Sequence, residues 1–323
     1  MDIVVQKYGG TSVASKEKLE MVIEKIIATS KEANRVVVIV SAQGKTTDAL
    51  IKKANEYCDK TYNKEMDLLL STGEMQTVAL LTMMLKNRGY DAIGLTGGQA
   101  GVVTDSNFSS AKIKMVMKEN ISKHLESGKI VIIAGFQGID KFGNITTLGR
   151  GGSDLSAVAI AASLKATRCE IYTDVDGVFS TDPNVINSAK LIKNISYDEM
   201  LEAATSGAKV LHNRAVSLAK KYKLKLQVKN TKGNNEGTLI EEKNNVSENY
   251  KAKVLAVQRN LAKITIIGEH MYSNIEYVWK IYNIAKENNV IIYMLSFSEV
   301  AINVIVAEEK ARDFATLIHN SML

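Results

Sequence analysis

The sequence predicts an α/β protein in two parts: a three-layer sandwich around a mostly parallel sheet, then a small α+β domain. The first observation is a strand at 3–5 that runs into a glycine turn, followed by apolar residues at helical spacing. The second is a pair of unbroken, branched apolar runs at 36–40 and 130–134, which are typical of strands buried on both faces. Helical patterns separate these strands, and that alternation is typical of parallel sheets with crossover helices.

The same periodicity assigns the remaining elements of the first part. Apolar spacing predicts helices over 74–86, 111–125 and 153–165. Short apolar runs at 136–138 and 145–148 flank a glycine-containing turn, which predicts a hairpin ahead of the last of these helices.

A polar segment at 241–251 predicts a linker between a domain over 1–243 and a second domain over 252–323. The second domain shows an approximate ββαββα order, which is typical of a small α+β fold. Its predicted strands are 254–257, 264–267, 290–295 and 300–306, and its predicted helices are 274–288 and the segment from Glu308.

Composition excludes several classes of protein. The 323 residues include 41 Lys and Arg against 35 Asp and Glu, a net charge of +6. The lysines are interspersed with acids and only 6% of residues are aromatic, so the charge does not indicate a nucleic-acid-binding protein. Cys58 and Cys169 can form neither a disulfide framework nor a zinc site. No signal-peptide pattern and no membrane-length apolar run is evident, so we expect a cytoplasmic protein without a membrane partner.

Glycine-rich loops after the predicted strands indicate a phosphorylated ligand. Ligands of parallel sheets bind beyond the carboxyl ends of the strands, where glycine backbones and helix N-termini accommodate anions. A P-loop is excluded because Ile39 stands where its first glycine belongs, and no dinucleotide fingerprint is present. The glycines concerned are Gly9 and Gly10 behind Lys7, Gly44, Gly97 and Gly98 with Gly101, and Gly149, Gly151 and Gly152 around Arg150.

Charged residues near these loops have both a structural and a functional interpretation. Glu74 either closes a capping box with Ser71 or binds a ligand. Asp154 either stabilises the start of a helix or belongs to the site. Lys209 is either a phosphate ligand or a solvated lysine, whereas the planar guanidinium of Arg150 favours bidentate binding of a carboxylate or phosphate.

The segment 173–178 ends a predicted strand with two carboxylates, Asp174 and Asp176. Val178 excludes a calcium loop, so these acids either orient magnesium through water or cap their own turn. No resident metal site is expected, because none of the histidines has a partner at ligand spacing, and His212 is expected to pack or to form hydrogen bonds.

The glycine loops and charged segments described above, in their order and spacing, resemble those of the aspartate kinases of the amino acid kinase superfamily. The last seventy or so residues resemble an ACT domain, the ferredoxin-like regulatory fold of that family. The resemblance implies an amino-acid-kinase fold for the first domain and one regulatory or assembly domain after it. The matching strings are KYGGTSV at 7–13, VSAQGKTTD at 40–48, STGEM at 71–75, GFQG at 135–138, TTLGRGGSD at 146–154, YTDVDGVFSTDP at 172–183 and GAKVLH at 207–212.

The resemblance implies a role for each matching residue. Lys7 and Lys209 would contact the transferring phosphoryl group, and Asp154 would organise both lysines. Glu74 would hold the ammonium of aspartate and Arg150 its carboxylate. The rest of the aspartate pocket would be Thr47, Phe136 and Ser153. The nucleotide-binding residues would be Lys7, Gly9, Gly10, Ser41, Thr173, Asp174, Phe179, Asp182 and Lys209.

The implied activity is an ATP-dependent phosphotransfer to a carboxyl acceptor. With ATP and Mg²⁺, the side-chain carboxylate of L-aspartate would become 4-phospho-L-aspartate, the first step towards lysine, threonine and methionine. This acceptor is already ionised at neutral pH, so no general base is required. The ACT-like domain implies lysine or threonine as an effector, and pairing into a homodimer or larger oligomer.

Two departures from the family pattern lie on the nucleotide side: Asn184 replaces a frequent basic residue and Asn213 replaces the usual proline. The chain also has room for one ACT unit where typical members carry two. The alternatives are another kinase of the superfamily, acting on acetylglutamate, glutamate or a nucleotide, or a non-catalytic paralogue that senses amino acids. Glu74 argues against acetylglutamate and a nucleotide, because a free ammonium calls for a carboxylate partner, whereas an acetylated amine or a nucleotide does not. The non-catalytic alternative is disfavoured because the charged residues of the family pattern are all present: Lys7, Glu74, Arg150, Asp154, Asp174 and Lys209.

Overall fold

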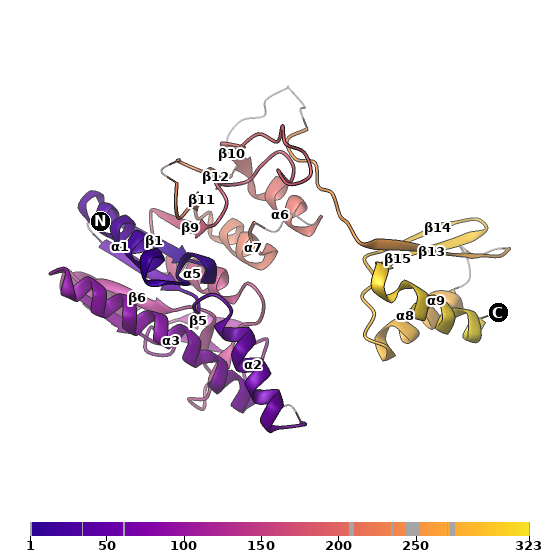
Figure 1. The fold of residues 1–323 in the computed structure, drawn as a ribbon, viewed down its shortest axis with the longest axis horizontal. Coiled ribbons are helices and arrows are strands. Elements are labelled where there is room, and N and C mark those ends of the chain that lie inside the picture. Colours follow the sequence, from indigo (N-terminus) through magenta and orange to yellow (C-terminus); the bar gives the residue numbers. More distant parts are fainter. Residues whose placement is uncertain are drawn as a thin grey trace. The chain divides into compact units, whose positions relative to one another are not determined.

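The chain forms two units in the computed structural model, Met1–Ala256 and Val257–Leu323, called unit 1 and unit 2 below. Figure 1 traces the chain from the N-terminus in indigo to the C-terminus in yellow. The residues described are 2–33, 35–60, 62–206, 210–233, 235–242, 252–269, 271 and 275–322. Most of the linker proposed at 241–251 lies outside them, so the division at that segment stays a prediction.

An eight-stranded sheet forms the centre of unit 1, in the order β10-β12-β11-β9-β1-β2-β6-β3. Neighbouring strands pair in parallel except β11 and β12. The mostly parallel sheet is therefore as predicted. The strands are β1 (Ile3–Tyr8), β2 (Arg35–Val40), β3 (Ala92–Leu95), β6 (Ile130–Ala134), β9 (Arg168–Thr173), β10 (Asn194–Ser196), β11 (Leu226–Asn230) and β12 (Thr238–Glu241).

Helices cover both faces of this sheet, which confirms the three layers (Figure 1). Along β2, Val36, Val38 and Val40 pack in one core with α1 (Lys16–Glu32) and α3 (Asn63–Asn87). The alternate residues Val37 and Ile39 pack in a second core with the helices of the other face. That burial on both sides explains the unbroken apolar run. The helices of the second core are α4 (Glu119–Glu126), α5 (Gly152–Ser163), α6 (Tyr197–Thr205) and α7 (Asn213–Tyr222).

A smaller sheet has the order β5-β4-β7-β8. The predicted hairpin is present as β7 (Gln137–Ile139) and β8 (Ile145–Thr147), which pair antiparallel. The helix predicted over 111–125 is wrong in its first half, because β5 (Ile113–Val116) pairs there with β4 (Val102–Thr104). Polar and apolar residues alternate from Lys112 to Met115, a strand period that the longer helical window concealed.

Within the described residues, α3 is the one helix that is long and apolar enough to cross a membrane. Half of its apolar window is buried inside the protein, where Val78, Leu81 and Leu85 pack against the sheet. Core packing therefore accounts for the apolar composition of this helix.

Unit 2 contains a three-stranded antiparallel sheet in the order β13-β15-β14. Its elements are β13 (Leu261–Ile267), α8 (Ile275–Glu287), β14 (Met294–Ser298), β15 (Ala301–Ala307) and α9 (Glu308–Met322). The first strand predicted for this unit, at 254–257, is wrong. Instead, Val254 packs against the core of unit 1, and the Leu255 N–H donates to the Ser180 carbonyl at 2.7 Å.

Candidate active site

Most of the predicted site residues lie at one edge of the central sheet, beyond the carboxyl ends of β1, β2, β6 and β9. Gly9 follows β1, Ser41 follows β2, and Asp174 follows β9. Because these strands are parallel neighbours, their following loops meet at the same edge. The sheet topology thus gathers segments far apart in the sequence.

A buried ion pair joins β1 to α5 at this edge. The Lys7 Nζ lies 2.7 Å from the Asp154 Oδ1, and the two side chains are only 12% and 14% exposed. Asp154 occupies the first turn of α5, so it favours the helix start as well as neutralising the lysine. Asp154 therefore stabilises the start of α5 and holds Lys7 as a fixed cation, while its part in a functional site stays a prediction.

Gly10 brings the loops after β1 and β2 into close contact. Its carbonyl oxygen accepts a hydrogen bond from the Gly44 N–H at 2.9 Å, and a Cβ added to Gly10 would lie 2.8 Å from the Ala42 carbonyl oxygen. No larger residue fits there without moving the backbone. Gly9 is similarly close to the ion pair, since its added Cβ would lie 3.4 Å from the Lys7 Nζ.

The loop after β2 is also bonded to α5. The Ser41 hydroxyl donates to the Ser153 Oγ at 3.0 Å. Thr47 lies near the same loop, half-buried in the first turn of α2 (Thr46–Tyr57). These contacts place Ser41, Ser153 and the ion pair in one continuous cluster.

Glu74 lies within α3, so the capping-box interpretation is wrong: the Ser71 hydroxyl donates to the Leu68 carbonyl instead. The Glu74 side chain is 3% exposed, and its Oε1 accepts a hydrogen bond from the Ala42 N–H at 3.1 Å. Within the described part of the chain, its Oε2 has no partner. Burial raises the pKa of Glu74 to about 7, although the Ala42 N–H opposes the shift. A buried carboxylate with a free oxygen is suited to a cationic ligand.

Phe136 and Arg150 border this cluster in unusual backbone settings. Phe136 has a φ of 67°, and its N–H donates to the Ser156 Oγ at 3.1 Å. Arg150 stands exposed between Gly149 and Gly151, which have φ values of 72° and 70°. A Cβ at Gly151 would lie 2.4 Å from the His212 ring, so only glycine fits. As expected, His212 also forms a hydrogen bond: its Nδ1 accepts from the Arg214 N–H. Arg150 makes no ion pair with any residue that the structure describes.

The predicted nucleotide residues lie after β9. The Thr173 hydroxyl donates to the Asp174 carboxylate at 3.1 Å, and Asp174 is exposed. Further along, Phe179 forms an isolated bridge with Leu191. Asp182 accepts hydrogen bonds from the backbone and side chain of Asn184. Neither Phe179 nor Asp182 bonds to the Lys7–Asp154 cluster, as far as the described residues go. Lys209 lies outside them.

The sequence analysis missed Asp67, a fully buried carboxylate on α3. It accepts hydrogen bonds from the Ser109 N–H and from both the N–H and hydroxyl of Thr147, at 2.7 to 3.0 Å. Thr147 ends β8, just ahead of Arg150. A single acid on an apolar helix face was the only signal, and its partners are distant in sequence.

The Asp67→Ala variant is expected to lower the free energy of unfolding by about 3 kcal/mol, because it leaves buried donors unsatisfied. Urea denaturation measures the change. Asp59→Ala, at an exposed position, is the control and should change it by less than about 0.5 kcal/mol. Equal stability of the two variants would contradict a structural role for Asp67.

A second buried polar group that the sequence did not reveal is Glu170 on β9. It accepts hydrogen bonds from Gln6, Arg168, Tyr172 and Lys229. Burial alone would raise its pKa, but Lys229, Gln6 and Arg168 together lower it below the ordinary value. These partners lie on β1, β9 and β11, so Glu170 stabilises the packing of these three strands.

Comparison with known proteins identifies the family of this chain. The model of the Amino acid kinase family matches residues 2–230. An aspartokinase of Bacillus sp. (strain MGA3) is 50% identical over 268 residues, covering 83% of this chain and 65% of the relative. An aspartate kinase of Pseudomonas putida is 42% identical over 302 residues, covering 89% and 74%. The chain thus spans about two thirds to three quarters of the length of these relatives.

Solved structures give the same result. Aspartokinase III of E. coli, in complex with lysine and aspartate, superposes with a TM-score of 0.84 at 25% identity, covering 98% of this chain and 83% of that one. Aspartate kinase from Synechocystis has a TM-score of 0.67 at 35% identity, covering 97% and 54%. The family match and these relatives together show that the chain belongs to the amino acid kinase family, where its relatives are aspartokinases.

Proposed function

We propose that the protein is an aspartate kinase, which transfers the γ-phosphoryl group of ATP to the side-chain carboxylate of L-aspartate. The observation that carries the proposal is Glu74, a buried carboxylate with a free oxygen. It is bonded to Ala42, in the loop whose Ser41 bonds to Ser153 next to Asp154. The ammonium group of an amino acid supplies the missing cation. The identity of 50% to an aspartokinase supports the same substrate.

In this proposal the reaction depends on positioned charges. A carboxylate oxygen of aspartate attacks the γ-phosphorus, the bond to the bridging oxygen breaks, and ADP leaves. The acceptor is already ionised, so no proton has to be removed from it. Lys7 offsets the charge that develops on the phosphoryl oxygens, and Lys209 is proposed to do the same.

The remaining residues bind the two substrates. Glu74 holds the ammonium of aspartate and Arg150 its α-carboxylate, while Thr47, Phe136 and Ser153 complete the pocket. Gly9, Gly10 and Ser41 border the phosphates, and Thr173, Asp174, Phe179 and Asp182 face the nucleotide. Mg²⁺ prefers phosphate oxygens with one or two carboxylates, and the exposed Asp174 supplies an oxygen donor of that kind. The metal would neutralise phosphate charge.

Regulation and assembly are proposed for unit 2. Aspartokinase III of E. coli has been solved with lysine and aspartate in a T-state and with aspartate and ADP in an R-state. By analogy we propose that lysine or threonine acts on unit 2, and that copies of unit 2 pair into a homodimer or larger oligomer. We place the reaction in the cytoplasm.

Acyl-phosphate formation, trapped with hydroxylamine, tests the activity. Aspartate, glutamate and N-acetylglutamate are compared, each with and without lysine and threonine. We expect turnover on aspartate alone. Turnover on another acceptor would identify a different kinase of the superfamily, and no turnover from folded protein would favour a non-catalytic paralogue.

The Arg150→Ala variant tests the assigned pocket. We expect the KM for aspartate to rise about 30- to 100-fold through loss of a charge-assisted hydrogen bond, while the affinity for ATP is unchanged. Because Arg150 is exposed, its truncation should leave the fold intact. Arg259→Ala, at an exposed position of unit 2, is the matched control. Loss of ATP binding instead would mean that Arg150 belongs to the nucleotide site.

A further inference from the structure

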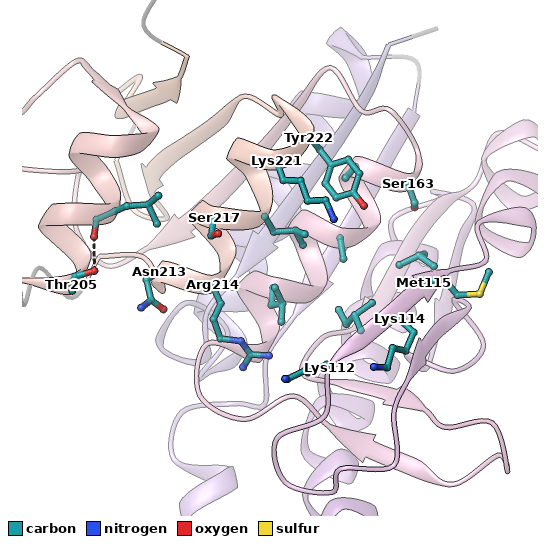
Figure 2. A pocket seen from close by; sticks show the side chains of 17 residues that line it. Lys112, Lys114, Met115, Ser163, Thr205, Asn213, Arg214, Ser217, Lys221 and Tyr222 are labelled. Atoms are coloured by element: carbon teal, nitrogen blue, oxygen red, sulfur yellow. Dashed lines mark hydrogen bonds between the residues drawn. The ribbon is translucent and has the colours of Figure 1, made fainter. Parts of the chain in front are cut away.

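A groove of about 690 Å³ lies on unit 1 between β5, α5 and α7 (Figure 2). None of the predicted catalytic, aspartate-binding or nucleotide-binding residues that the structure describes lines it, although Asn213, noted above as a departure from the family pattern, does. Its volume is within the range of sites for small organic molecules, which is roughly 300 to 1,000 Å³. It is therefore large enough to hold a ligand of its own.

Apolar side chains form the floor of the groove. Leu155 and Ala159 line it from α5 and are largely buried, and Leu218 lines it from α7. At one end, Tyr222 adds an aromatic ring that is 55% exposed. A flat apolar body can pack against such a floor, and an aromatic one can also contact the ring.

The charged side chains of the groove are all basic: Lys112, Lys114, Arg214 and Lys221. Lys114 pairs with Asp105 at 3.2 Å. Judged on the described residues, Lys112, Arg214 and Lys221 have no acidic partner, and no carboxylate lines the groove. Unpaired cations around an apolar floor attract an anion.

The arrangement of these cations is partly fixed. The Arg214 Nη1 donates to the Leu148 carbonyl at 2.7 Å, which fixes the guanidinium at one end of the groove. Within the described residues, its other N–H groups have no partner and can bind a ligand. Figure 2 shows Lys112 near this end, and Lys221 with Tyr222 at the other end. The Lys221 Nζ lies 5.5 Å from the centre of the Tyr222 ring. An anionic group and a ring thus have separate places in the groove.

We propose that this groove is a second ligand site, which binds a small aromatic organic anion carrying a phosphate, sulfonate or carboxylate group. The anionic group lies against Arg214 and Lys112, and the ring packs on Leu155 and Leu218 near Tyr222. The proposal does not depend on the reaction at the other site.

Pyridoxal 5′-phosphate is a suitable probe, because it joins an aromatic ring and a phosphate to an aldehyde that reacts with lysine. The lysine nitrogen adds to the aldehyde, water leaves, and borohydride reduces the imine to a stable amine. Mass spectrometry of peptides from the full-length chain then locates each labelled lysine and separates the groove from Lys7. Lys123, an exposed lysine of α4 that does not line the groove and has no acidic partner among the described residues, is the internal control.

We expect labelling at Lys112 or Lys221 to saturate with probe concentration and to exceed labelling at Lys123 about tenfold at low concentration. Pyridoxal, which lacks the phosphate, should lose this preference. Arg214→Gln should weaken the apparent affinity about tenfold. Ser217→Trp, at an exposed groove position, should abolish saturable labelling by filling the space.

Labelling of Lys112 and Lys221 that rises linearly and matches labelling of Lys123 would overturn the proposal. Equal preference with pyridoxal would also overturn it, since the anionic group would then play no part. Both readouts use the unaltered protein and require no aspartate turnover, so they stand whether or not the proposed kinase activity is found.

Discussion

The Lys7→Met variant is expected to lose about a thousandfold in kcat, because a fixed cation at the transferring phosphoryl group supplies several kcal/mol of transition-state stabilisation. Methionine approximates the length of lysine, so the packing beside Gly9 is kept. The hydroxylamine assay at saturating ATP and aspartate measures the effect.

Stability must be followed in parallel, because the substitution leaves the Asp154 carboxylate without its partner. We expect a loss of about 1 to 3 kcal/mol, measured by urea denaturation. Lys16→Met, at an exposed position at the start of α1, removes the same charge without touching the site. A fall in kcat of less than tenfold, with the fold intact, would remove Lys7 from the catalytic residues.

The Glu74→Gln variant is expected to raise the KM for aspartate about a hundredfold while ATP binding persists. Glutamine keeps the oxygen that accepts from the Ala42 N–H but removes the charge that is proposed to hold the ammonium. In the unaltered protein, kcat/KM for aspartate should rise about tenfold per pH unit up to about pH 7, where the pKa of Glu74 lies, and then level off. The variant should lack this rise.

The same group makes stability depend on pH. The pKa of Glu74 is about 7 in the folded protein, against an ordinary value of 4.5, so the folded state keeps a proton that the unfolded state releases. This contribution is fully present below about pH 4.5 and is lost as the pH rises through 7, a decrease of about 3 kcal/mol. Denaturation of protein and variant at pH 5 and pH 8 measures it. A variant with the same decrease would show that Glu74 is not the titrating group.

Prediction from sequence succeeded where the deciding information was local. The branched runs of β2 and β6 indicated buried strands, and the glycines after β1 indicated a tight loop at the carboxyl end of that strand. It failed where a distant partner decides. Glu74 matched a capping box, but its carboxylate bonds to a loop more than thirty residues earlier. Asp67 gave almost no signal, because its partners Ser109 and Thr147 are brought to it only by the fold.

Two errors in the predicted strands have the same cause, a pairing partner that the local pattern does not reveal. The helical window over 111–125 concealed β5, whose alternation is short and whose partner β4 precedes it. The apolar run at 254–257, which was predicted to open the second domain, has strand composition, yet Val254 packs against the core of unit 1 and the run joins none of the described sheets. Composition shows that a segment is apolar, whereas its pairing depends on which backbone lies beside it.

The open sheet of unit 2 has a consequence for how the protein behaves at high concentration. Within the described residues, β13 and β14 are both edge strands, each with one row of backbone groups that no strand pairs. Lys263 protects β13, but β14 has no charged residue, and its Met294 and Phe297 are 58% and 49% exposed. Uncharged apolar edges are templates for adding further strands. As the protein is concentrated, its folded molecules are therefore expected to associate through β14 and to precipitate.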